Sequence, residues 1–363
     1  MSLDPLFRPV RLGAVEAANR MLMAPMTRGR AEADGTPNDL MAAYYVQRAT
    51  AGLMITEATP VSRQGVGWLG APGMYTDAHV AGWRKVTTAA HAAKGRIYLQ
   101  LWHMGRVSHP DFHGGALPVG PSAVAAKGES HTPLGKKAYV TPRALDLAEI
   151  PGIVAAFGEA TRRARDAGFD GVEIHGANGY LVDQFLRDGS NHRTDAYGGD
   201  VERRTRFAVE VAEACAKAWA PDRVGFRVSP RGTYNDMSDR DPATTFGRLA
   251  ERLSALKLGY LHVVEGLPGS MMHTPGATVA PVLRKAFRGA FVLNGGYDAA
   301  KAAAAIAAGE ADAVAFGVPF LCTPDFVART KAGKPMNPPD FSTLYTPGAK
   351  GYTDYPAIDP AAA

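Results

Sequence analysis

The sequence predicts an α/β fold: a (β/α)8 TIM barrel in which residues 1–363 form a single domain. Two observations support this prediction. Short apolar runs typical of strands alternate along the whole chain with amphipathic, alanine-rich stretches of helical period, and the strand-type runs number eight. Eight strands that are each followed by a helix are typical of a parallel sheet closed as a barrel. A doubly wound sheet is the alternative, and the regular count favours the barrel.

The predicted strands comprise residues 21–24, 53–56, 97–101, 171–174, 224–228, 260–264, 290–293 and 313–316. Helical period is clearest over residues 80–93, 150–167 and 201–218. Asp77 is expected to precede the second helix, and Pro242, which follows Asp241, suits the first turn of a later one. Glycine stands at four expected helix ends, namely Gly95, Gly168, Gly259 and Gly309.

The longest predicted insertion comprises residues 105–147, between the third strand and its helix. It is rich in glycine, proline and serine, and a long loop at that end of a barrel strand usually covers an active site. We therefore expect this insertion to lie over the mouth of the barrel.

The composition is that of an ordinary globular protein, with 46% hydrophobic and 21% charged residues. The net charge of +5 comes from scattered basic residues, which argues against a nucleic-acid partner. There is no run of eighteen apolar residues, and Asp4 and Arg8 interrupt any signal peptide, so we expect a cytoplasmic protein without a membrane partner, either a monomer or a homodimer. Two distant cysteines, Cys215 and Cys322, exclude a disulfide framework and cysteine-ligated metal clusters, and we expect both to be buried.

Catalytic groups of a barrel lie at the carboxyl ends of its strands. The residues at these predicted ends are Pro25, Met26, Thr27, Glu57, Ala58, Gln100, Trp102, His175, Arg227, Glu265, Asn294, Gly295, Gly296 and Gly317. The set contains no lysine, which argues against a Schiff-base aldolase. It also has no pair of carboxylates on adjacent strands, which argues against a glycosidase.

The densest polar cluster follows the fourth strand. His175 and Asn178 can point the same way and hold an oxygen that gains negative charge, and Tyr180 can donate a proton. The structural alternative is a capping asparagine, a satisfied histidine and a packed tyrosine. Arg227 ends the fifth strand, where a buried guanidinium needs an anionic partner, either a ligand or a structural carboxylate.

Glycines follow the seventh and eighth strands, where barrels commonly bind phosphate. Gly295, Gly296 and Gly317 would let backbone N–H groups approach an anion, although tight turns alone could also explain them.

Two further patterns are discounted. Residues 65–70 match the glycine spacing of a dinucleotide site but do not connect a strand directly to a helix. His109, Asp111 and His113 have metal-ligand spacing, but they lie in a proline-containing loop, and we predict no metal site.

Six segments together resemble the old yellow enzyme family. They are residues 24–28 (APMTR), 100–105 (QLWHMG), 175–180 (HGANGY), 191–199 (NHRTDAYGG), 224–230 (VGFRVSP) and 351–356 (GYTDYP), and they occur in the family's order along essentially the whole chain. The family is one of flavin-dependent barrels that reduce activated alkenes.

The resemblance implies a role for each residue at the FMN ring. Thr27 matches the threonine at the flavin O4 edge and is counted with the catalytic residues. Pro25 and Ala58 match backbone contacts to the ring, and Gln100 matches the amide at its pyrimidine edge. Arg227 matches the arginine beside N1 and O2, so that its anionic partner would be the reduced flavin.

The implied phosphate cradle comprises Gly295, Gly296, Gly317 and Val318. Val318 stands where the family usually has an arginine that reaches the phosphate. Loss of such a contact costs about 1.5–3 kcal/mol, so FMN could be bound less tightly unless another cation compensates. Two smaller points are Arg203, where asparagine is usual, and Thr27, where one branch of the family has cysteine.

For the substrate, the resemblance implies that His175 and Asn178 hold its electron-withdrawing oxygen, with His175 also at the cofactor, and that Tyr180 is the proton donor. Trp68, Trp102 and Tyr352 match aromatic positions around the substrate pocket. The implied reaction is ping-pong: NADPH or NADH reduces FMN, and an α,β-unsaturated carbonyl compound, imide or nitroalkene then takes up the hydride. The alternatives are a reductase of nitrate esters or nitroaromatics at the same site, or a barrel that has lost flavin and only binds a ligand.

Overall fold

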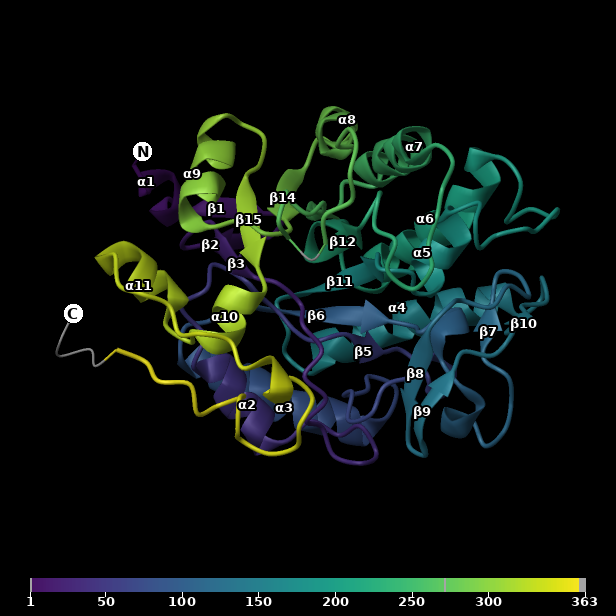
Figure 1. Ribbon diagram of the computed structural model, residues 1–363, viewed down its shortest axis with the longest axis horizontal. Coiled ribbons are helices and arrows are strands. Elements are labelled where there is room, and N and C mark those ends of the chain that lie inside the picture. Colours follow the sequence, from purple (N-terminus) through teal and green to yellow (C-terminus); the bar gives the residue numbers. More distant parts are fainter. Residues whose placement is uncertain (1, 271, 359–363) are drawn as a thin grey trace.

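The computed structural model of the chain describes residues 2–270 and 272–358. At its centre is a closed ring of parallel strands (Figure 1). The ring comprises β3 (Met21–Met23), β4 (Met54–Ile55), β6 (Ile97–Trp102), β11 (Gly171–Gly176), β12 (Val224–Val228), β13 (Tyr260–Val264), β14 (Ala290–Asn294) and β15 (Ala313–Phe316). It closes where Val314 of β15 pairs with Met21 of β3. The predicted barrel and its eight strands are confirmed.

The end of the barrel at which the strands begin, called its lower end here, is covered by a largely apolar cluster. A hairpin of β1 (Val10–Leu12) and β2 (Val15–Ala17) precedes the first barrel strand. Leu12 and Val15 of this hairpin belong to one buried cluster with Tyr98 and Tyr260 of the barrel interior. The hairpin therefore covers this end of the barrel.

Helices surround the ring, as is usual for a parallel barrel. They are α2 (Asp39–Val46), α3 (Asp77–Ala92), α4 (Ile150–Asp166), α5 (Leu181–Leu186), α6 (Val201–Ala218), α7 (Pro242–Ala255), α8 (Ala280–Ala286), α9 (Ala299–Ala307), α10 (Val318–Cys322) and α11 (Phe326–Ala332), with α1 (Asp4–Phe7) before the hairpin. Pro242 begins α7 with Asp241 as its N-cap, as predicted. The second helix begins earlier than expected: Asp77 is its first residue, and the Thr76 hydroxyl caps it by accepting from the His79 amide. None of the helices in the described ranges could cross a membrane.

The insertion after β6 has its own small strands. These are β7 (Val119–Gly120), β8 (Glu129–Thr132), β9 (Gly135–Ala138) and β10 (Arg143–Ala144), with 3-10 turns at Gly105–Val107 and Pro110–Phe112. Val107 and Ala126 of the insertion pack with Ala58 and Trp102 at the upper ends of the strands. Asp111, discounted above as a metal ligand, binds Lys137 and Thr132 within the insertion, at 2.7 and 2.6 Å.

The C-terminal segment, yellow in Figure 1, returns to the barrel after α11 and includes a 3-10 turn at Phe341–Thr343. Two buried arginines after β3 hold it through its carbonyl groups. Arg28 donates to Gly351 O at 2.6 Å, and Arg30 donates to Leu344 O at 2.7 Å and Thr343 O at 2.8 Å. The segment is therefore part of the folded domain and forms one wall of the barrel mouth.

Candidate active site

The upper part of the barrel contains a layer of buried polar side chains centred on Glu173 of β11. Its carboxylate accepts three hydrogen bonds: from Gln100 Nε2 at 2.8 Å, from the Tyr260 hydroxyl at 3.1 Å and from His262 Nδ1 at 2.8 Å. Glu173 and His262 have no exposed surface, and Gln100 is 1% exposed. Burial lowers the pKa of His262 despite the carboxylate, so the ring is neutral. This layer separates the apolar core from the site above it.

Arg227 lies in the same region and is incompletely paired. One of its nitrogens, Nη2, donates to Asn294 Oδ1 at 2.9 Å, and Nε is buried without a partner among the described residues. Burial lowers the pKa of Arg227, while the neighbouring Glu173 carboxylate opposes that shift. Arginine keeps its charge in proteins, so the site holds a buried cation that can take a further acceptor.

His175 on β11 is in register with Arg227 on the neighbouring strand, β12. Burial lowers the pKa of His175 well below its usual value, and Arg227 and His262 lower it further, so the imidazole is neutral. Its Nδ1 is buried and makes no hydrogen bond within the described part of the chain. A neutral imidazole with an unused nitrogen can donate to a ligand oxygen.

The turn after β11 brings Asn178 next to His175. Asn178 has φ of 57°, and its amide N–H donates to Ser229 Oγ at 2.8 Å. Its carbonyl oxygen accepts from Asn235 at 2.8 Å. Its side-chain Oδ1 has no partner in the described residues. The backbone is thus fixed from both sides, while the amide is left to interact with a ligand.

Tyr180 packs between two aromatic neighbours. Its ring centroid lies 4.9 Å from that of Trp102 and 4.8 Å from that of His175, both in edge-on geometry. Burial raises the pKa of Tyr180 well above its usual value, and the phenol groups of Tyr234, Tyr139 and Tyr345 raise it further. The hydroxyl therefore stays protonated at neutral pH and is available as a proton donor.

Aromatic residues from separate segments surround this cluster. Trp68, from the loop before α3, meets Tyr345 of the C-terminal segment at 5.0 Å between ring centroids, while Tyr139 comes from the insertion and Tyr234 from the loop after β12. Tyr234 and Tyr345 are about half exposed. These three tyrosines could not be predicted from the sequence, because only the fold brings them to Tyr180.

Tyr352, predicted to shape the pocket, is buried beside α2 and the segment after β3. It has no exposed surface, and its ring stacks on that of Tyr44 with 4.1 Å between the centroids. The guanidinium groups of Arg28 and Arg30 also lie over the Tyr352 ring. Tyr352 supports the C-terminal segment, and its hydroxyl is buried without a partner among the described residues, so its role at the pocket remains a prediction. Tyr345, seven residues earlier, faces the mouth. Trp102 is 1% exposed, so it backs Tyr180 and does not form an open wall.

The segment after β3 carries Pro25 and Thr27 and is fixed by a buried carboxylate. Glu57 Oε2 accepts from the backbone amides of Arg28 and Gly29, each at 2.9 Å. Pro25 is buried and Thr27 is partly exposed, and their contact with the cofactor remains a prediction. Ala58 belongs to the cluster beneath the insertion.

The glycines after β14 and β15 are explained in part by packing. A Cβ on Gly295 would lie 2.6 Å from the Glu265 carbonyl oxygen, and one on Gly296 would lie 2.7 Å from Ser270 Cβ, while both residues have positive φ. Gly317 precedes α10, which begins at Val318. The tight-turn explanation is therefore sufficient for the first two glycines, and their predicted role in phosphate binding remains a prediction.

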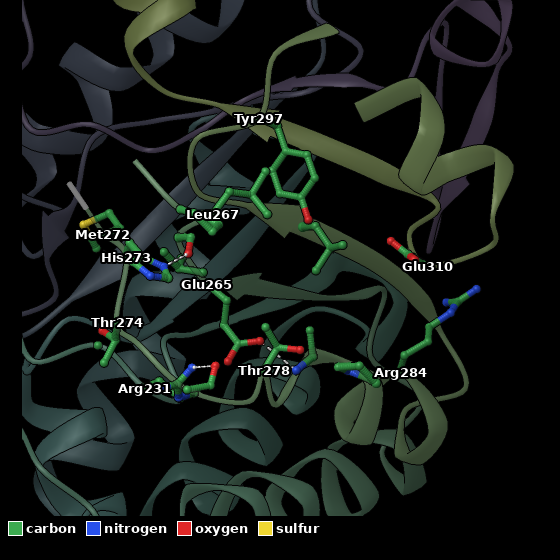
Figure 2. A pocket seen from close by; sticks show the side chains of 18 of the residues that line it. Arg231, Glu265, Leu267, Met272, His273, Thr274, Thr278, Arg284, Tyr297 and Glu310 are labelled. Carbon is green, nitrogen blue, oxygen red and sulfur yellow. Dashed lines mark hydrogen bonds between the residues drawn. The ribbon is translucent and has the colours of Figure 1, made fainter. Parts of the chain in front are cut away.

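A cavity of about 660 Å³ lies beside this glycine turn, under the loop after β13 (Figure 2). Figure 2 shows the Tyr297 hydroxyl pointing into the cavity and Glu265 turned toward the segment around Thr278. The Glu265 carboxylate accepts from the amides of Val279 and Ala280 at 2.8–3.0 Å. Glu265, found at a strand end in the sequence, thus has the structural task of holding the start of α8.

Comparison with known proteins identifies the family. Residues 5–337 match the family described as NADH:flavin oxidoreductase / NADH oxidase. The solved structure of the old yellow enzyme homologue from Zymomonas mobilis is 45% identical, with a TM-score of 0.95 over 97% of this chain and 99% of that one. The chain belongs to the old yellow enzyme family. This confirms the resemblance found in the motifs, the oxidoreductase class and the FMN cofactor.

Two further relatives have names that indicate reductases with a nicotinamide or flavin cofactor. Morphinone reductase, solved in complex with tetrahydroNAD, is 44% identical over 99% of both chains, with a TM-score of 0.94. A probable flavin mononucleotide-dependent alkene reductase of Leishmania infantum is 41% identical over 98% of both chains.

The buried residues of this old yellow enzyme family member fit a bound FMN. Arg227 is a buried cation with an unused nitrogen, and an isoalloxazine offers it acceptor atoms. Gln100 belongs to the polar layer around Glu173, with its amide nitrogen already bound. The chemistry of this donor set matches the polar edge of a flavin ring.

Proposed function

We propose that the chain is an FMN-dependent NAD(P)H:alkene oxidoreductase that reduces activated C=C bonds of α,β-unsaturated carbonyl compounds, imides or nitroalkenes. The observation that carries the proposal is the cluster of a neutral His175, an Asn178 side chain whose Oδ1 has no partner among the described residues, and a protonated Tyr180, with His175 in register with the buried Arg227. Bound FMN supplies the hydride relay between the reduced nicotinamide and the alkene.

The residues that would hold the cofactor surround the upper end of the barrel. Arg227 and Gln100 would bind the pyrimidine edge, and Thr27 the opposite edge, with Pro25 and Ala58 contributing backbone contacts. The backbone of Gly295, Gly296, Gly317 and Val318 would hold the phosphate. Because Val318 carries no charge, this cradle depends on backbone N–H groups.

His175 and Asn178 would bind the electron-withdrawing oxygen of the substrate. Both side chains are neutral donors, and an amide can rotate to present its NH2 group. As negative charge develops on that oxygen, two fixed donors in a buried site stabilise it better than mobile water would. The support from Ser229 and Asn235 keeps the Asn178 backbone in place for this task.

Tyr180 would donate the proton that completes the reduction at the α-carbon. Its raised pKa keeps the phenol protonated, and its two aromatic neighbours fix the ring. The rim of Trp68, Tyr139, Tyr234 and Tyr345 would exclude water and favour flat, largely apolar substrates.

An absorption spectrum followed by an anaerobic titration tests the proposal. We expect a flavin band that bleaches with NADPH and returns when 2-cyclohexenone is added. If the colour returns only with a nitrate ester or nitroaromatic compound, the alkene assignment is wrong. If the purified protein is colourless and added FMN does not bind, the flavin site itself is wrong. A colourless protein that takes up FMN supports the site and indicates the weakening expected at Val318.

A further inference from the structure

We propose that Glu173 is a positioning residue for the flavin edge: it holds the Gln100 amide with its oxygen toward the cofactor and supplies the negative charge that balances Arg227. This inference rests on the flavin site proposed above. Glu173 lies within a strand, between Val172 and Ile174, and belongs to the polar layer and not to the cluster that would meet the substrate.

The strand register brings three donors to one carboxylate. Glu173 of β11 is opposite Gln100 on β6 and opposite Gly225 on β12. Gly225 in turn is opposite Tyr260 on β13, and a Cβ at Gly225 would lie 2.2 Å from the Tyr260 ring. The absence of a side chain at Gly225 therefore lets Tyr260 lie across β12 and reach Glu173. The arrangement depends on residues from four adjacent strands.

The carboxylate fixes the orientation of the Gln100 amide. A carboxylate only accepts, so the group that Gln100 directs toward it at 2.8 Å is its NH2. The other end of the amide is an oxygen, which is left as an acceptor. A flavin ring carries one N–H donor on its pyrimidine edge, at N3, and that donor requires an acceptor. Without Glu173 the amide could rotate and present a second donor to this N–H.

The same carboxylate determines the net charge next to the flavin. Its other two partners carry no charge, since burial lowers the pKa of His262 and raises that of Tyr260. On β12, Arg227 lies two residues beyond Gly225, the residue opposite Glu173, and the nearby carboxylate favours the charged guanidinium. The pair therefore sums to no net charge. Removing the carboxylate would leave the arginine uncompensated beside a ring that becomes negative when reduced.

Three variants of the full-length protein, reconstituted with FMN, test the inference. Glu173→Gln removes the charge and keeps the shape. Tyr260→Phe is the matched control, because it removes one donor to the same carboxylate without changing any charge. The exchange variant Gln100→Glu/Glu173→Gln returns the carboxylate to the layer and places an acceptor-only side chain at position 100. The measurements are the two-electron potential of bound FMN and the dissociation constant of FMN from the apoprotein.

We expect Glu173→Gln to favour reduced FMN about tenfold, a rise of about 30 mV for a two-electron couple. Tyr260→Phe should stay near the wild-type potential, and the exchange variant should return to it or fall below. The exchange variant should still bind FMN, since position 100 remains an acceptor. Circular dichroism of the apoproteins verifies folding. If Glu173→Gln does not fold, the potential and FMN affinity of the exchange variant test the inference.

A Glu173→Gln potential equal to that of Tyr260→Phe overturns the charge role. A folded exchange variant that no longer binds FMN, or whose potential lies above that of the wild type, overturns the inference as a whole. These failures differ from failure of the proposed function, in which the wild-type apoprotein itself would not bind FMN.

Discussion

Replacement of Tyr180 by phenylalanine should separate the two halves of the catalytic cycle. The substitution keeps the ring between Trp102 and His175, whose centroids lie 4.9 and 4.8 Å away, and removes only the hydroxyl. Because burial raises the pKa of Tyr180, the lost group is a fully protonated donor at neutral pH. Loss of a positioned proton donor costs about 10²–10⁴ in rate, or about 2.7–5.4 kcal/mol in activation free energy.

Anaerobic stopped-flow measurements distinguish the steps. Bleaching of bound FMN by NADPH should change by less than about twofold, since no proton from Tyr180 is needed there, whereas reoxidation by 2-cyclohexenone should slow by about 10²–10⁴. Tyr234→Phe is the matched control, because it removes a phenol hydroxyl from the half-exposed rim of the same mouth. If Tyr180→Phe slows both steps equally, the assigned proton transfer is refuted and a role in packing or nicotinamide binding replaces it.

Three further predictions follow from buried or paired groups. Because burial holds its pKa well below 6.5, His175 should remain neutral, and kcat/KM for alkene reduction should show no transition near pH 6.5. A transition near pH 6.5 that disappears in the His175→Asn variant would contradict this prediction. Gly225→Ala should destabilise the fold by about 1–3 kcal/mol in urea unfolding, since the new Cβ would meet the Tyr260 ring; unchanged stability would mean that Tyr260 does not need this space. Arg143 lowers the pKa of Glu149 to about 2, so this pair's stabilisation is complete above pH 4.5 and is lost as the pH falls toward 2. Both partners are about one-third exposed or more, so Glu149→Gln should reduce the acid-dependent loss of stability by less than about 1 kcal/mol in melts between pH 2 and pH 5, and an unchanged pH dependence would show that the pair contributes nothing.

The ring of strands could be predicted from the sequence because each strand is a short apolar run, buried on both sides, and each helix has its own period. The same logic located His175, Asn178 and Arg227, since strand ends in a parallel barrel meet at one place. These are local signals, and they are retained in the folded chain.

The remaining features of the site depend on contacts between distant segments. Tyr352 belongs to the C-terminal motif and stacks on Tyr44, whereas Tyr345, which lies before that motif, reaches Trp68. Glu173 lies inside an apolar strand, and its carboxylate is held by hydrogen-bond donors on β6 and β13. Sequence periodicity carries no information about such cross-strand partners, so these residues could not be found without the fold.

The closure of the barrel by its first and last strands has a consequence for how the protein is made. Because β15 pairs with β3, the ring cannot close until residues 313–316 have left the ribosome. Arg28 and Arg30 emerge early, but their carbonyl partners, Leu344 and Gly351, emerge more than 300 residues later. Contacts of such long sequence separation form late in folding. The mouth of the barrel is therefore expected to take its final shape only after these late-emerging segments have joined β3 and the two arginines that follow it.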